Sequence, residues 1–138
     1  MILGGMTQNT PQPNVWPILI YDDAPAAIRF LVAVFGFEET MVVPGEGNGE
    51  IAHAQLRWPE GGGIMLSSYK KEAEVSFGTP GGGSVYVVTD APDAVFERAM
   101  AAGAPLVREM REEDYGSRGF SVRDPEANVW SFGTYRGA

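Results

Sequence analysis

The feature that most constrains the fold is a start signal that occurs twice, about half a chain apart. The sequence YDDAP at residues 21–25 and the sequence VTDAP at residues 88–92 both follow a β-rich segment. In each copy, side-chain oxygens that can cap a helix precede a proline suited to the first helical turn. Each copy therefore predicts a strand followed by a helix, and the pair indicates an internal repeat of about 65 residues.

The segments after the two start signals also follow one order. Helical periodicity continues to a glycine in each copy, Gly36 in the first and Gly103 in the second, where a helix end favours left-handed backbone. Three β-like segments come next. They lie at residues 37–43, 51–58 and 64–68 in the first copy, and at residues 105–111, 119–122 and 129–134 in the second. Glycine and proline turns separate them, so each copy has the order βαβββ.

This order predicts an α+β fold in which two βαβββ modules form one cupped mixed sheet. We expect a flexible lead-in at residues 1–14 and then a single domain at residues 15–138. Its modules span residues 15–68 and 83–135, and a Gly-rich linker at residues 69–82 joins them. Each module leaves one apolar sheet face uncovered, so two halves placed edge to edge would enclose a cavity.

Composition excludes several classes of function. The 138 residues include no cysteine, which rules out a disulfide framework, a thiolate metal site and a cysteine nucleophile. The net charge is −8 and the only lysines are Lys70 and Lys71, so we expect no nucleic-acid partner. No stretch approaches about 18 consecutive apolar residues, and the first residues do not match a signal peptide. We therefore expect a cytoplasmic protein with no membrane partner.

The end of the second copy resembles a known family. The sequence DYGSRG at residues 114–119, followed by DPEANVWSFG at residues 124–133, resembles the closing hairpin of the vicinal oxygen chelate superfamily, also called the glyoxalase/bleomycin resistance protein/dioxygenase family. The helical segments at residues 23–36 and 90–103 resemble this family too. The resemblance implies a glyoxalase/bleomycin-resistance-like fold with one small-molecule pocket and, in many members, a homodimer. It does not imply one reaction, because the family includes glyoxalases, ring-cleaving dioxygenases, epimerases, fosfomycin-modifying enzymes and metal-free drug-binding proteins.

The same resemblance places the family's metal ligands at uncharged residues of this chain. By motif spacing, these positions are Trp16, Gln55, Ser84 or its neighbour Gly83, and Ser131. A catalytic divalent ion usually needs about three histidine or carboxylate ligands, so we expect neither a metal nor another cofactor. A metal held instead by groups such as Glu50 or Glu126 stays open as an alternative.

The resemblance also indicates which residues line the cavity. The predicted lining residues are Trp16, His53, Gln55, Met65, Tyr86, Phe120, Trp130 and Ser131. Aromatic walls with a few polar groups suit a flat or amphipathic organic ligand. Adjacent residues of a strand face opposite ways, so Trp130 and Ser131 cannot both face the cavity. Core packing is the alternative for each aromatic side chain.

His53 is the only histidine and the one candidate catalytic residue. It lies two residues from Gln55 and therefore on the same face of its strand. Histidine is the side chain best suited to general acid–base work near neutral pH. The alternative is a hydrogen-bonded residue in the wall of the pocket.

Two local features carry no chemistry of their own. The mixed-charge run at residues 109–114 is interpreted as a solvated strand end and loop. Ala127 stands where the turn of the resembled hairpin usually has glycine, and a positive φ at alanine costs about 1 kcal/mol. We therefore expect a strained or distorted turn at Ala127.

Three hypotheses about function follow. The first is a metal-independent binding protein that sequesters a small drug or metabolite, as in antibiotic resistance, between its halves or between the subunits of a homodimer. The second is an enzyme, either a glyoxalase-like lyase or isomerase or a dioxygenase, in which His53 acts as general base. The third is an accessory domain that mainly dimerises and whose cavity is filled by its own side chains.

Overall fold

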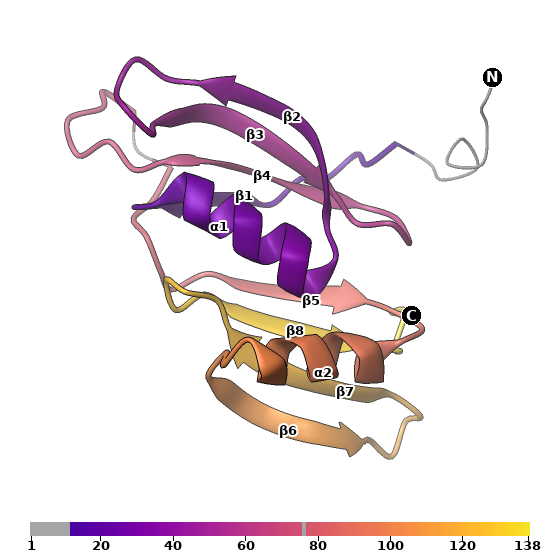
Figure 1. Cartoon of the computed structure of the whole chain (residues 1–138). Coiled ribbons are helices and arrows are strands. Elements are labelled where there is room, and N and C mark those ends of the chain that lie inside the picture. The colour runs from indigo at the N-terminus through magenta and orange to yellow at the C-terminus, as the bar shows by residue number, and fades with distance from the viewer. Residues whose placement is uncertain (1–11, 76) are drawn as a thin grey trace.

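The computed structural model describes residues 12–75 and 77–138, so most of the lead-in expected at residues 1–14 lies outside the described residues. The elements follow the predicted order twice (Figure 1). The first module contains β1 (Ile18–Tyr21), α1 (Ala24–Phe30), η2 (Leu31–Phe35), β2 (Glu38–Pro44), β3 (Ile51–Arg57) and β4 (Gly63–Ser68). The second contains β5 (Ser84–Val88), α2 (Pro92–Ala101), β6 (Leu106–Glu112), β7 (Arg118–Arg123) and β8 (Val129–Gly133). The doubled βαβββ order is confirmed.

Each module forms a four-stranded mixed sheet of its own. The strand orders are β1-β4-β3-β2 and β5-β8-β7-β6. The first and last strands of each module pair in parallel, and the other neighbours pair antiparallel. The α+β fold class is therefore confirmed, and the strands are divided between two mixed sheets that lie next to each other, with β5 as the strand of the second sheet nearest the first (Figure 1).

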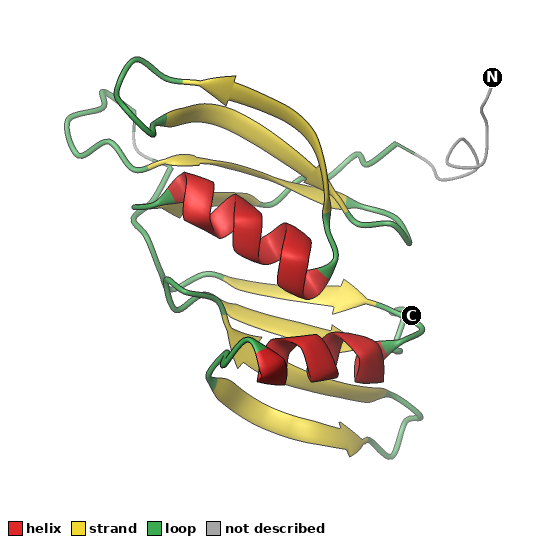
Figure 2. Cartoon of the chain, in the orientation of Figure 1, coloured by secondary structure: helices red, strands yellow, loops and turns green. Residues whose placement is uncertain are grey.

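The two helices lie on the same side of the molecule. Both lie in front of their sheets in Figure 2, so each sheet has one face covered by a helix and one uncovered face. Side chains along a strand alternate between these faces. In β3, for example, Ala54 and Leu56 are buried toward the helix, while His53 and Gln55 point the other way. Within the described residues, no helix is long and apolar enough to cross a membrane.

The first helix begins and ends as the sequence predicts. Asp23 occupies the cap position, and its Oδ1 accepts a hydrogen bond from the backbone of the first turn at 3.1 Å. Gly36 ends the helix with a φ of 100°. The last turn, η2, is widened, because the N–H groups of Gly36 and Phe37 both donate to the carbonyl of Leu31 at 3.1 Å. This turn ends at Phe35, which is fully buried.

The second helix begins without a side-chain cap. Ala91 occupies the cap position that Asp23 holds in the first module, and Pro92 is the first helical residue. The match between the two start signals pairs Ala91 with Ala24, so the structural repeat is shifted by one residue from the sequence repeat. The Oγ1 of Thr89 compensates in part by accepting a hydrogen bond from the N–H of Ala91 at 3.1 Å.

A cluster of aromatic rings joins the two modules. The ring centroid of Phe35 lies 5.4 Å from that of Trp130 and 4.7 Å from that of Phe132. The ring of Trp58 lies 5.0 Å from Phe37 and 5.8 Å from Phe132. All five side chains are buried. Because large apolar rings dominate the burial energy of a core, the modules share one core.

Two glutamates also connect the modules, and they do so reciprocally. Glu60, in the turn after β3, accepts hydrogen bonds from the N–H of Asp90 at 2.8 Å and from the hydroxyl of Thr89 at 2.7 Å. Glu126, in the turn after β7, accepts hydrogen bonds at 2.7 and 2.8 Å from the two N–H groups that precede α1. Each glutamate therefore holds the start of the other module's helix, where a carboxylate is favoured.

Candidate functional site

The uncovered face of the first sheet brings three of the predicted site residues together. His53 and Gln55 lie on β3, and Met65 of β4 lies opposite Gln55. The edge strand β2 adds Met41 and Val43, which lie opposite Gln55 and His53. This face therefore surrounds one polar pair with flexible and aliphatic apolar side chains.

The polar pair is internally hydrogen-bonded. The Nε2 atoms of Gln55 and His53 lie 3.0 Å apart. An amide nitrogen can only donate, so with this amide orientation the Nε2 of His53 accepts and the imidazole proton lies on Nδ1. Within the described residues, the amide oxygen of Gln55 has no protein partner. It is therefore available to accept a hydrogen bond from a ligand.

Trp16 lies on this face as well. A Cβ atom added to Gly63 would lie 2.7 Å from the ring of Trp16. Gly63 and Met65 point to the same side of β4 by alternation, so the Trp16 ring lies on the uncovered face. A residue with a side chain at Gly63 would displace it.

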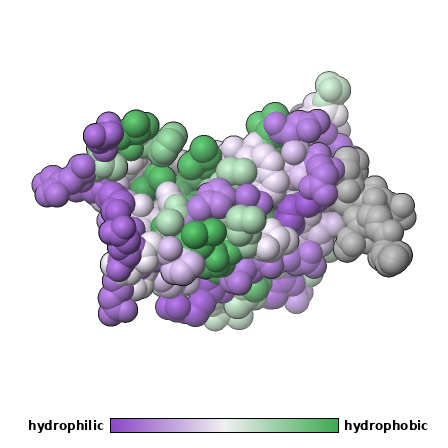
Figure 3. Space-filling model, turned by 90° about the horizontal axis from the view of Figure 1, so that it is seen from above, coloured by the Kyte–Doolittle hydropathy of each residue, from purple (hydrophilic) through white to green (hydrophobic). Residues whose placement is uncertain are grey.

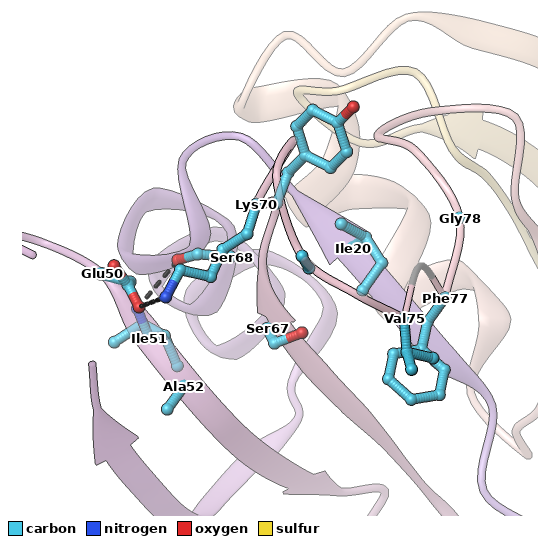
Figure 4. Close-up of a pocket in the computed structure, with 12 residues that line it drawn as sticks. Ile20, Glu50, Ile51, Ala52, Ser67, Ser68, Lys70, Val75, Phe77 and Gly78 are labelled. Carbon is cyan, nitrogen blue, oxygen red and sulfur yellow. Dashed lines mark hydrogen bonds and ion pairs between the residues drawn. The ribbon is translucent and has the colours of Figure 1, made fainter. Parts of the chain in front are cut away.

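A cavity of about 230 Å³ opens on the same sheet, next to the linker (Figure 4). Ile20 of β1 lines it from the sheet, and Val75 and Phe77 line it from the linker. Lys70 and Glu50 form an ion pair of 3.2 Å at its border. The linker, which the sequence indicates only as a connection, therefore contributes an apolar wall.

The uncovered face of the second sheet carries a separate cavity of about 180 Å³. Tyr86 of β5 and Ser121 of β7 both lie opposite Ser131 of β8, and all three line this cavity. The hydroxyl oxygens of Ser121 and Ser131 lie 2.6 Å apart, and the hydroxyl of Tyr86 donates to the carbonyl of Tyr135 at 2.7 Å. Desolvation raises the pKa of Tyr86, so its hydroxyl remains a donor at neutral pH.

Two of the predicted lining residues are buried in the core, and one of them, Phe120, also borders the second cavity. Trp130 is 0% exposed, and its indole N–H donates to Asp124 at 3.0 Å. Phe120 borders the second cavity but is only 2% exposed, because its ring stacks on that of Phe132. Strand alternation turns Trp130 toward the helix and Ser131 toward the uncovered face. Trp130 therefore lies outside the candidate site, whereas Ser131 lines the second cavity and Phe120 borders it from the core.

The donor groups do not fit a catalytic divalent ion. Gln55 is bonded to His53, and Ser131 is bonded to Ser121. The two carboxylates named as alternatives are also engaged, Glu50 by Lys70 and Glu126 by the backbone before α1. Within residues 12–75 and 77–138, no three histidine or carboxylate side chains are placed to hold a metal ion together.

An ion pair that the sequence pattern did not indicate lies in the wall of the second cavity. Arg108 and Glu113 both line the second cavity and form an ion pair of 2.7 Å. Glu113 belongs to the run at residues 109–114 that we interpreted as a solvated loop. Alternation from the start of β6 could not place these side chains, because the pairing of β6 with β7 shifts register on both sides of Arg108.

Comparison with known proteins identifies a family that matches most of the chain. A model of the Glyoxalase/Bleomycin resistance protein/Dioxygenase superfamily matches residues 15–132. An uncharacterized protein of Mycobacterium tuberculosis is 36% identical over 130 residues, which cover 88% of this chain and 74% of that protein. The crystal structure of TioX from Micromonospora sp. ML1 is 31% identical with a TM-score of 0.70, covering 87% of this chain and 98% of TioX. A lactoylglutathione lyase from Agrobacterium tumefaciens shares the fold at 22% identity, with a TM-score of 0.65 and coverage of 89% and 94%.

Proposed function

The chain belongs to the Glyoxalase/Bleomycin resistance protein/Dioxygenase superfamily, and from this membership we propose that it is a metal-independent protein that binds a small drug or metabolite. The ligand lies on the uncovered sheet faces. The observation that carries the proposal is the chemistry of those faces, where Gln55 and Ser131 occupy two of the positions that the resemblance gives to metal ligands. Neutral hydrogen-bonding groups set among apolar walls favour an organic ligand over a metal ion.

A second copy of the chain completes the proposed site. Ile18, Met41, Val43 and Tyr86 lie on the uncovered faces and are each between 44% and 49% exposed. Figure 3, which views the molecule from above, on the side of β2, shows hydrophobic residues among hydrophilic ones there as well. Large exposed apolar side chains are typical of an interface, and a two-fold dimer would bury them on both subunits at once. We therefore place the ligand between subunits rather than between the halves of one chain.

One observation favours catalysis as a second candidate function. The Nε2 of His53 lies on the uncovered face, 3.0 Å from the amide nitrogen of Gln55, and with this amide orientation it accepts a hydrogen bond, as the nitrogen of a general base can. Gln55 already occupies that nitrogen, so proton abstraction would require the Gln55 amide to move aside. A His53→Ala variant separates the two functions, since a binding protein loses affinity at most whereas an enzyme loses turnover.

Binding is tested by thermal shift and calorimetry with a panel of flat, amphipathic organic compounds, on protein dialysed against a chelator. We expect at least one compound to raise the midpoint of unfolding without added metal. Gln55→Trp and Ser131→Trp, which fill the uncovered faces, should abolish the shift. Ala101→Trp, on the exposed side of α2, should leave it intact. A shift that needs an added divalent ion, or that survives both filling variants, contradicts the proposal.

The dimer is tested by light scattering on the purified chain. We expect twice the mass of one chain. A monomer over the concentration range of the binding experiment contradicts the placement of the ligand between subunits.

A further inference from the structure

The cavity on the second sheet contains a positive group, although the chain carries a net charge of −8. Arg108 donates from Nη2 to the Oε1 of Glu113 at 2.7 Å, and Arg111 donates from Nε to the same oxygen at 2.6 Å. Two guanidinium groups therefore share one carboxylate, which leaves this cluster with a single net positive charge. Of the two arginines, Arg108 lines the cavity.

Arg108 has hydrogen-bond donors to spare. A guanidinium group carries five N–H donors, and within the described residues Arg108 uses only Nη2. Glu113 already fixes one edge of this guanidinium. A planar guanidinium with a free edge matches a carboxylate through two parallel hydrogen bonds.

The floor of the cavity offers one more donor. Only one hydroxyl of the Ser121–Ser131 pair can donate within the pair, and among residues 12–75 and 77–138 the other hydroxyl hydrogen has no further partner. Gly119 and Gly133 also border the cavity and contribute no side chain to it. A Cβ atom at Gly133 would lie 2.9 Å from the hydroxyl oxygen of Tyr86, so glycine keeps the floor flat there.

Aromatic rings complete the walls. Tyr86 and Tyr115 line the cavity, and the ring of Tyr115 packs edge-on against Tyr135 at 5.3 Å. Flat aromatic walls favour a flat ring as ligand, either stacked or edge-on. The arginine and the free serine hydrogen favour an acceptor that carries negative charge.

We propose that this cavity binds the carboxylate end of a planar aromatic acid. The carboxylate lies on Arg108 and the Ser121–Ser131 pair, and the ring lies against Tyr86 and Tyr115. This inference rests on the proposed function and specifies the class of ligand as an organic anion. Glu113 competes with that anion for Arg108, so it limits the affinity.

The test compares two probes of nearly the same shape, 2-naphthoate and its neutral amide 2-naphthamide, by titration calorimetry on the full chain. We expect wild type to bind the acid about tenfold more tightly than the amide. Arg108→Gln should reduce this preference to less than about threefold, and Glu113→Gln should strengthen acid binding several-fold without changing amide binding. Arg29→Gln, which removes the same charge from the exposed side of α1, is the matched control and should keep the preference.

Each outcome separates this inference from the function on which it rests. Equal or tighter binding of the amide by wild type overturns the inference and leaves the proposed small-molecule function standing. Binding of neither probe overturns the inference, and the compound panel described above then decides the function independently. A loss of preference in Arg29→Gln as large as that in Arg108→Gln overturns the role of Arg108 in favour of a general charge effect. The comparison of probes on wild type requires no variant to fold.

Discussion

The turns before the last strand of each module occupy equivalent places but hold the other module with different chemistry. In the first module this turn begins with Trp58, whose indole N–H donates to the carbonyl of Val88 at 2.9 Å and whose ring packs in the aromatic core. In the second module it begins with Asp124, a carboxylate that is only 2% exposed. One turn is held mainly by packing and the other by a buried charge.

The buried charge is fully hydrogen-bonded. Asp124 Oδ2 accepts from the hydroxyl of Tyr21 at 2.6 Å and from the side chains of Asn128 and Trp130 at 3.0 Å. Its Oδ1 accepts from the backbone N–H groups of Glu126 and Asn128 at 2.9 and 3.1 Å. A buried carboxylate is tolerated only with such partners, so the second turn is more sensitive to the loss of one group than the first.

The largest expected effect tests this asymmetry directly. Asp124→Asn removes the charge and turns an acceptor into a donor that faces other donors, so we expect it to lower the free energy of unfolding by roughly 3 kcal/mol or more. Trp58→Phe, the matched change in the first module, should cost about 1–2 kcal/mol, because it loses one hydrogen bond and part of a ring. Urea unfolding followed by circular dichroism measures both. Equal costs would show that the two turns do not differ in this way.

The next effect depends on pH. Burial, and then the charge of Asp124, raise the pKa of Tyr21 far above its ordinary value of about 10. The folded state thus favours the protonated phenol, which contributes stability below pH of about 10 and loses that contribution as the pH rises further. Tyr21→Phe should cost about 2 kcal/mol at pH 7, since it removes a hydrogen bond to a charged group.

Above pH 10 the Tyr21→Phe variant should lose stability with a shallower slope than wild type. Thr89→Val serves as the control. This variant removes the hydroxyl of the second module that bonds to Glu60. Because that hydroxyl does not titrate, the stability of Thr89→Val should depend on pH with the same slope as that of wild type. Parallel slopes for wild type and Tyr21→Phe would contradict the role assigned to Tyr21. Unfolding midpoints between pH 8 and 11 give these slopes.

Smaller effects are expected at equivalent positions of the two turns, where a change to glycine in one turn and a change to alanine in the other should have opposite signs. Ala127 has a φ of 73°, the positive value at which alanine is strained. Gly61 holds the equivalent position in the first module with a φ of 123°. Ala127→Gly should therefore raise the free energy of unfolding by up to about 1 kcal/mol, and Gly61→Ala should lower it by about 1 kcal/mol or more. Thermal unfolding measures both variants. A destabilised Ala127→Gly would show that the turn gains more from alanine's lower chain entropy than it loses to strain.

The smallest effect concerns the helix starts. Asp23→Ala removes a side-chain cap from α1 and should cost about 1 kcal/mol. Ala91→Ser supplies α2 with the cap that it lacks and should add about 0.5–1 kcal/mol. The midpoints of denaturant unfolding measure both variants, provided that the unfolding free energy depends on denaturant concentration with the same slope. If Ala91→Ser brings no gain, the hydrogen bond from Ala91 to Thr89 already satisfies that helix start.

Local chemistry in the sequence was sufficient to predict the order of the helices and strands and some of the site residues. A capping aspartate and a turn glycine predicted where the first helix begins and ends, and alternation placed His53 and Gln55 on one face of their strand. Met65 joins them only through the pairing of β4 with β3. Alternation also stated that Trp130 and Ser131 face opposite ways, but it could not say which one faces the core. That choice depends on where the helix packs, which is a contact between elements distant in the chain.

The sequence by itself determined the doubled βαβββ order and the positive φ at Ala127, because both depend on residue type and local spacing. The uncharged residues at the mapped metal positions came from the family resemblance. The tertiary structure decided the rest. The division into two sheets, the reciprocal glutamates, the partners of Asp124 and the place of Arg108 in a cavity all join residues far apart in sequence. Such contacts depend on packing and strand register, which local periodicity does not encode.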